Sequence, residues 1–215
     1  MIHMLRSILV LIMVTAASSQ AKASDEPSYV LVRAQGAIEV RDYPALILAE
    51  VEVSGDMTRA GNQGFRPLAG FIFGDNQAPG EDSSANIAMT TPVIQSRSER
   101  IAMTSPVTQS RTAGDGETWR VAFIMPESWT METLPRPNDP DVIIREQPAR
   151  RLAAIRFSGG PNESRFARKA EELAAFLAAE GYEIIGEPVY ARYNPPWTPT
   201  PMRRNEVMIE VARAD

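Results

Sequence analysis

The side chains that usually perform nucleophilic or metal chemistry are scarce in this sequence. The chain contains no cysteine, and its only histidine is His3. A Ser-His-Asp triad, a Cys-His pair and a histidine-based zinc site each need one of these two residue types. Because His3 lies in a segment that we expect to be removed, the sequence excludes all three kinds of site from the mature chain.

Acid–base chemistry would therefore depend on carboxylates such as Glu39, Asp42 or Glu206, or on Tyr193. Nothing in their spacing indicates a catalytic pair. Lys169, the only lysine after residue 22, falls among polar positions of an expected helix, which argues against a Schiff-base role. The sequence thus favours a binding protein over an enzyme.

The first 23 residues have the pattern of a signal peptide. Arg6 supplies a positive charge, residues 7–17 are mostly apolar, and Ala21-Lys22-Ala23 is a small-x-small cleavage site. The apolar stretch is shorter than the roughly 20 residues of a membrane-spanning helix. We expect cleavage near Ala23 and a periplasmic or secreted protein without a stable membrane anchor.

The expected mature chain is one acidic domain over residues 24–215. Cleavage removes two of the 22 basic residues and none of the 27 acidic ones, so the remaining formal charge is −7. Nucleic-acid binders need clustered cations to neutralise phosphates, so a nucleic-acid partner is not expected.

A long internal repeat relates two segments of the chain, about 29–125 and 141–213. Residues 38–45 align with residues 142–149 at an offset of 104 without a gap. In each copy an alternating, strand-like stretch leads to a glycine and then a helical pattern. The identical pairs are Arg41 with Arg145, Pro44 with Pro148, Ala45 with Ala149, Ala49 with Ala153, and Gly55 with Gly159.

Each copy predicts one helix. The first spans roughly residues 56–73, and its Gly61, Gly64 and Gly70 each cost about 1 kcal/mol relative to alanine, so it must rely on packing or ligand contact. In the second, Pro161 suits the first turn and Gly181 ends the helix. Its apolar stripe consists of Phe166, Ala170, Leu173 and Leu177.

Two strand-like segments follow each helix, which predicts two β-α-β-β units. The fold class is α+β: a distorted antiparallel barrel or sheet flanked by two helices on one side. The proline-rich residues 135–140 would connect the halves. The expected strands after the helices are residues 86–95, 101–109, 118–125, 187–193 and 205–211.

A short repeat of 14 residues relates residues 87–95 to residues 101–109, each with an Ile-Ala-Met-Thr-x-Pro-Val core. Pro92 and Pro106 cannot donate to a sheet ladder, so we expect each at an edge or bulge. Met89 and Met103 occupy equivalent places in the two copies.

Five sequence motifs together resemble the SOUL haem-binding-protein family, in the family's order and across almost all of the mature chain. They are Ile38-Glu39-Val40-Arg41-Asp42-Tyr43-Pro44, Phe71-Ile72-Phe73-Gly74-Asp75-Asn76, the doubled Ile-Ala-Met-Thr-x-Pro-Val strand, Phe123-Ile124-Met125-Pro126, and Tyr193-Asn194-Pro195-Pro196-Trp197 followed by Arg203-Arg204-Asn205-Glu206-Val207.

The resemblance implies a duplicated β-α-β-β fold akin to bacterial effector-binding domains. It also implies binding of haem or another tetrapyrrole in a shallow apolar groove near the first helix, with basic residues near the propionates. Some family members use a histidine ligand. This sequence departs from that mode of ligation, so we expect weak or no axial ligation, by a methionine, Tyr193 or water.

A porphyrin is a flat apolar disc with two carboxylates, so it needs an apolar slot with cations at the mouth. On the first helix, Phe65, Leu68 and Ile72 could form the slot and Arg66 could supply a cation. In the loop near the C-terminus, Trp197 and Met202 could cover a ring face while Arg203 and Arg204 reach propionates. Met89 and Met103 could be adaptable wall residues.

Structural roles compete with these assignments. Phe65, Leu68 and Ile72, like the two methionines, are often simply core residues. Arg203 and Arg204 could instead pair with Glu206 or Glu210. Trp197, in a segment with four prolines, is less typical of a core.

These observations favour a carrier or buffer for a tetrapyrrole. Two alternatives remain: an effector-binding module for another small amphipathic ligand, and an enzyme that inserts or removes the metal of a tetrapyrrole.

Overall fold

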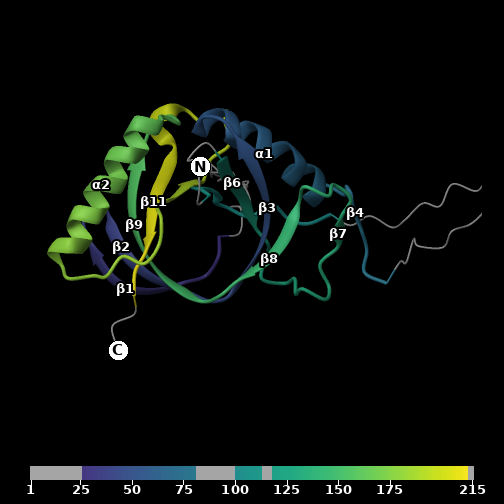
Figure 1. Ribbon diagram of the computed structural model, residues 1–215, viewed down its shortest axis with the longest axis horizontal. Coiled ribbons are helices and arrows are strands. Elements are labelled where there is room, and N and C mark those ends of the chain that lie inside the picture. Colours follow the sequence, from purple (N-terminus) through teal and green to yellow (C-terminus); the bar gives the residue numbers. More distant parts are fainter. Residues whose placement is uncertain (1–25, 81–99, 113–117, 213–215) are drawn as a thin grey trace, which may run out of the picture.

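The structure is a computed structural model that describes residues 26–80, 100–112 and 118–212. Within these residues, nine strands form one antiparallel sheet with two α-helices (Figure 1). The described strands do not close into a barrel, and their order is β1-β2-β9-β11-β10-β5-β6-β3-β8. The strands are β1 (Val30–Gln35), β2 (Ile38–Tyr43), β3 (Leu46–Ser54), β5 (Val107–Arg111), β6 (Thr118–Ile124), β8 (Ile143–Gln147), β9 (Arg150–Ser158), β10 (Val189–Arg192) and β11 (Arg204–Glu210).

The strand order confirms the duplicated fold. Without β1, the sheet reads β2-β9-β11-β10 from one end and β8-β3-β6-β5 from the other, so counterparts of the two halves take mirrored places. β3 and β9 start 104 residues apart and share the same pattern of buried and exposed positions. β2 pairs with β9 and β8 pairs with β3, so each half gives its first repeat strand to the other half.

Both helices follow a glycine with positive φ, as the sequence predicts. Gly55 (φ 123°) precedes α1 (Met57–Ile72), and Gly159 (φ 127°) precedes α2 (Glu163–Ala179). Asp56 caps α1 by accepting from the amides of Thr58 and Arg59, and Asn162 caps α2 by accepting from the amide of Arg165. The expectation for Pro161 is wrong, because this proline lies before the N-cap residue and outside the first turn. The predicted α2 stripe is buried in full.

The glycines of α1 let the helix approach the sheet closely. A Cβ atom at Gly64 would lie 2.7 Å from Val121 and 3.1 Å from Val51. At Gly61 it would collide with the side chain of Arg192. Close packing against the sheet therefore explains why glycine occupies these two positions despite its low helix propensity.

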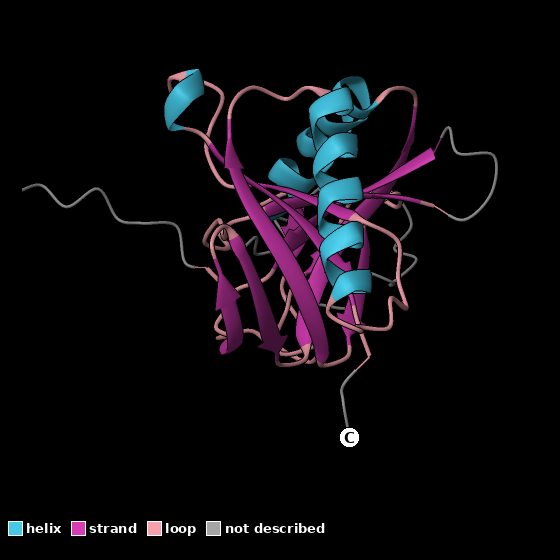
Figure 2. Cartoon of the chain, turned by 90° about the vertical axis from the view of Figure 1, so that its left-hand side faces the viewer, coloured by secondary structure: helices cyan, strands magenta, loops and turns pink. Residues whose placement is uncertain are grey.

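The helices cover the same face of the sheet and lie on the outside of its curve (Figure 1). α2 packs on β9 and β11, and α1 packs on β3 and β6. Figure 2 shows α2 lying across the outer surface of the strands. Neither helix of the described chain is long and apolar enough to span a membrane.

The opposite, inner face of the sheet carries a smaller apolar cluster. Because side chains alternate along a strand, the neighbours of helix-facing residues point inward. Among the inward residues, Tyr43, Leu152, Ala154, Ala191 and Met208 form this cluster. The polar groups described below share the inner face with it.

Between α1 and α2, the observed strands differ from the expected ones in small ways. The strand expected from residue 101 begins only at Val107, directly after Pro106, so this proline stays out of the ladder. The partner segment 86–95 lies outside the described residues. The connection between the halves contains β7 (Arg136–Pro137), which pairs with β4 (Asn76–Gln77).

Candidate functional site

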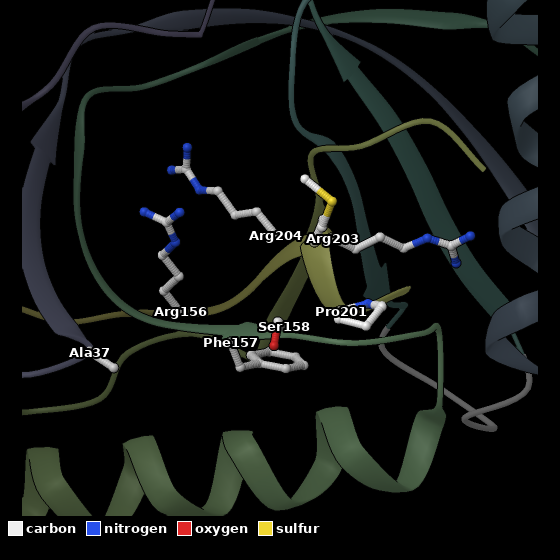
Figure 3. Close-up of a pocket in the computed structure, with 8 residues that line it drawn as sticks. Ala37, Arg156, Phe157, Ser158, Pro201, Arg203 and Arg204 are labelled. Carbon is white, nitrogen blue, oxygen red and sulfur yellow. The ribbon is translucent and has the colours of Figure 1, made fainter. Parts of the chain in front are cut away.

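A surface pocket of about 380 Å³ lies beside the connection between β10 and β11. This connection contains a short 3-10 helix, η1 (Thr200–Met202). The pocket also uses the end of β9 and the β1–β2 turn (Figure 3). Its lining consists of Ala37, Arg156, Phe157, Ser158, Pro201, Met202, Arg203 and Arg204.

Two of the three arginines direct their guanidinium groups to the same side of this pocket. Figure 3 shows Arg156 and Arg204 pointing one way and Arg203 pointing the opposite way. Arg156 is exposed, and its guanidinium has no ion pair with any described residue. Sequence reasoning missed Arg156; its signal was a polar position between the apolar Ile155 and Phe157 in a strand of alternating pattern, which places Arg156 on the face opposite to α2.

Arg203 holds the loop that carries Trp197. Its Nε donates to the carbonyl of Thr198 at 2.8 Å, and its NH2 donates to the carbonyl of Pro196. Trp197 is 82% exposed and Met202 is 74% exposed. The loop thus presents two apolar side chains to solvent, while Arg203 is turned toward the loop backbone.

Arg204 joins the pocket to a buried polar network. It donates to Glu206 through Nε at 3.0 Å and NH2 at 2.8 Å, and to Glu26 through NH1 at 2.9 Å. Its guanidinium carbon lies 3.8 Å from the centre of the Tyr193 ring. The ion pair between Arg204 and Glu206, which the sequence offered as an alternative to propionate binding, is therefore present in the structure.

Glu206 is the centre of this network and is fully buried. Arg41 donates to it at 2.7 and 3.2 Å, and the hydroxyl of Tyr193 donates at 2.6 Å. Burial raises the pKa of Glu206, but the hydrogen bonds and positive charge of Arg41 outweigh burial, so the net pKa is lowered. Burial and the charge of Glu206 raise the pKa of Tyr193, so this hydroxyl stays protonated.

The α1 residues predicted for the slot have divergent environments. Leu68 and Ile72 are 0% and 1% exposed and pack in the core between α1 and the sheet. Phe65 is 40% exposed, with its ring edge against Phe123 at 5.3 Å between centroids. Arg66 is exposed. None of these four residues lines the pocket of Figure 3, so the structure does not join the two halves of the predicted site.

Of the two methionines in the short repeat, the structure describes Met103. Met103 is 37% exposed, in the segment between α1 and β5. Met89 lies outside the described residues. Their roles as wall residues stay predictions.

Comparison with known protein families identifies the chain. The profile of the SOUL heme-binding protein family matches residues 24–210. The chain belongs to the SOUL family. A search of curated proteins found no match.

Solved structures similar to this SOUL domain share its fold at low identity. The crystal structure of the EcmrR C-terminal domain has a TM-score of 0.57 and 12% identity, and the match covers 82% of this chain and 98% of that domain. A hydrolase from Listeria innocua has a TM-score of 0.52 and 11% identity, over 84% of this chain and 94% of its own. Identities this low show the fold alone.

Family membership makes a tetrapyrrole the relevant small molecule for this SOUL domain. Within the described residues, no group of three or more His, Cys, Asp or Glu side chains could hold a metal ion by itself. The hydroxyl of Tyr193 donates a hydrogen bond to Glu206, which commits this group to the network.

Proposed function

We propose that this SOUL protein is an exported carrier or buffer that holds haem or another tetrapyrrole in the pocket beside η1. The observation that carries the proposal is the combination of apolar side chains with two guanidinium groups that point to the same side. Phe157, Pro201 and Met202 supply the apolar surface, and Arg156 and Arg204 supply the cations.

The pocket fits one part of a porphyrin better than a whole one. Its volume of about 380 Å³ is at the lower end of the roughly 300–1,000 Å³ typical of small-molecule sites. A macrocycle seated there would keep much of its surface in solvent, next to the exposed Trp197. This supports modest affinity and easy exchange, which suit a carrier.

Ligation of the iron by the protein would be weak or absent in this arrangement. The thioether of Met202 lines the pocket and is the available soft ligand there. Arg156 has the clearer role, because a free guanidinium can pair with a propionate without breaking an existing contact.

Haemin titration of the purified protein tests the binding site. We expect a shift of the Soret band that saturates near one equivalent, and weaker binding by about tenfold for Arg156→Gln, which removes one charged partner. Arg168→Gln, at an exposed position of α2, is the matched control and should bind as the wild type does. A flat titration at micromolar protein, or equal binding by Arg156→Gln, would reject this site.

Export is tested separately. The sequence of residues 1–23 supports cleavage near Ala23. N-terminal sequencing of the protein from fractionated cells of its native host should find a chain that starts near Ser24 outside the cytoplasm. A full-length chain retained in the cytoplasm would reject export and leave the binding proposal untouched.

A further inference from the structure

A second pocket lies inside the curve of the sheet, on the face that the helices do not cover. Its volume is about 190 Å³. Residues from β3, β5 and β6 of the first half and from β8, β9 and β10 of the second half line it, so the curled sheet surrounds it. Among its lining residues and those of the pocket beside η1 there is no residue in common.

Strand alternation places charged side chains in this inner pocket. On β3 and β6, Val51 and Val121 face α1, so their neighbours Glu50 and Arg120 face inward. The edge strand β8 adds Arg145, and the start of β9 adds Arg150. With Arg111 of β5, four arginines thus line a space of about 190 Å³, together with three glutamates, Glu50, Glu187 and Glu210.

One buried carboxylate serves two of these arginines. Glu50 is 6% exposed and accepts two hydrogen bonds from Arg145, both at 3.1 Å. Arg120 approaches the same carboxylate at 3.5 Å, and its NH2 group reaches the exposed Glu52 at 2.8 Å. The negative charge of Glu50 is therefore already shared between two arginines.

Arg150 is the least compensated of these arginines. Its side chain is 20% exposed, and its ion pair with Glu210 is a long contact of 3.4 Å. Among the described residues, the buried Nε atoms of Arg150 and Arg120 lack a hydrogen-bond partner. Burial lowers the pKa of Arg150 despite Glu210, and the nearby charge of Arg145 lowers it further. Buried donors of this kind are costly unless something accepts from them.

We propose that the inner pocket binds a small organic anion through a carboxylate or phosphate group held by Arg150 and Arg120. Guanidinium groups recognise both kinds of oxyanion with paired hydrogen bonds. Ser110 adds a hydroxyl donor, while Leu48 and Leu152 give a short carbon chain an apolar wall. The small volume excludes a porphyrin, so this ligand is distinct from the tetrapyrrole.

Calorimetric titration with two probes, inorganic phosphate and succinate, tests the site at constant ionic strength. We expect at least one probe to bind the full-length protein at one equivalent with a Kd of about 1 mM or lower. Binding of phosphate alone assigns a phosphate-bearing ligand, binding of succinate alone assigns a carboxylate, and binding of both assigns a general oxyanion site. Binding of neither overturns the proposal.

The variant Arg150→Met locates the binding. Methionine keeps most of the length and apolar volume of the side chain, and Glu210, with 30% of its side chain exposed, stays solvated. The variant should bind the probe about tenfold more weakly or not at all. Arg168→Met, on the outer helix, is the control and should bind normally. Equal binding by Arg150→Met and the wild type overturns the proposal.

Two further measurements separate loss of the site from loss of the fold. Circular dichroism and thermal unfolding report whether Arg150→Met is folded, and Arg120→Gln replaces it if it is not. Haemin binding should be unchanged in either folded variant, because the two pockets are distinct. Failure of the anion site and failure of the tetrapyrrole proposal thus give different results.

Discussion

At the scale of single residues, the decisive feature is a buried carboxylate that satisfies several donors at once. Glu206 accepts from Arg41, Tyr193 and Arg204, and Arg41 is itself only 2% exposed. The loss of one member of such a buried pair leaves an uncompensated charge. The network therefore ties the first half, through Arg41, to the last strand of the second.

The substitution Glu206→Gln should lower the free energy of unfolding by about 3–5 kcal/mol at pH 7, because Arg41 would lose its buried counter-charge and keep only the part-exposed Glu39 as an ion-pair partner. Urea denaturation followed by circular dichroism measures this loss. Glu172→Gln removes an exposed ion pair with Lys169 and should cost less than about 1 kcal/mol. Equal effects of the two substitutions would contradict a stabilising role for the network.

The stability advantage of the wild type over Glu206→Gln should depend on pH in a defined direction. The folded pKa of Glu206 is lowered, so the unfolded chain takes up a proton first as the pH falls. The advantage should be full above the unfolded pKa of about 4.3 and should vanish as the pH falls through the lower folded pKa. Denaturation curves of both proteins between pH 7 and pH 3 measure it; an advantage that is constant over this range would refute the assignment.

At the scale of elements, the contrast between two glycines of α1 tests how the helix meets the sheet. Gly64→Ala should destabilise the protein by about 1–3 kcal/mol, because its Cβ would lie 2.7 Å from Val121. Gly70→Ala should stabilise it by up to about 1 kcal/mol, because the nearest atom outside the helix, in Asp75, is 3.7 Å away. Thermal unfolding of both variants measures the difference, and effects of the same sign would contradict the close packing.

The positions of the two helices could be predicted from the sequence because glycine stops and apolar stripes are local signals, whereas the strand expected from residue 101 begins only at Val107. The α2 stripe and the 104-residue repeat are both present in the structure. The partners of an apolar stripe are not local, so the sequence could not tell whether Leu68 and Ile72 face a ligand or the sheet; they face the sheet. Likewise, adjacent residues entering a strand point to opposite sides, so Arg203 and Arg204 could not both reach one rim.

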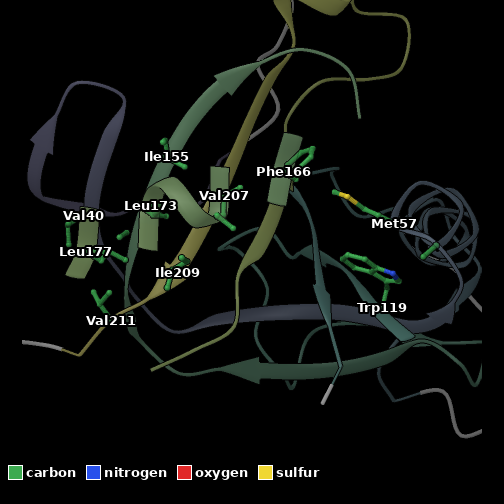
Figure 4. Close-up of a cluster of buried hydrophobic side chains, with 13 residues drawn as sticks. Val40, Met57, Trp119, Ile155, Phe166, Leu173, Leu177, Val207, Ile209 and Val211 are labelled. Carbon is green, nitrogen blue, oxygen red and sulfur yellow. The ribbon is translucent and has the colours of Figure 1, made fainter. Parts of the chain in front are cut away.

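At the scale of the whole molecule, the two halves exchange strands and share a core. The repeat predicted two units, but repeat spacing carries no information about which unit a strand joins. Figure 4 shows Met57 and Trp119 of the first half in the same apolar cluster as Phe166 and Val207 of the second. The rings of Trp119 and Tyr190 lie 5.8 Å apart across this junction.

A cut between the halves should therefore leave them associated. A protease site inserted between the exposed Pro140 and Asp141 would separate β1–β7 from β8–β11. The pairs β2 with β9, β3 with β8, and β5 with β10 all cross this cut, as does the shared core. After cleavage the two pieces should elute together in size-exclusion chromatography and separate only in urea. Their unfolding temperature should rise with protein concentration, because the folded state is now an assembly of two chains. Two pieces that separate in native buffer and keep their circular dichroism would mean that each half folds alone, and the exchanged strands would then contribute little to stability.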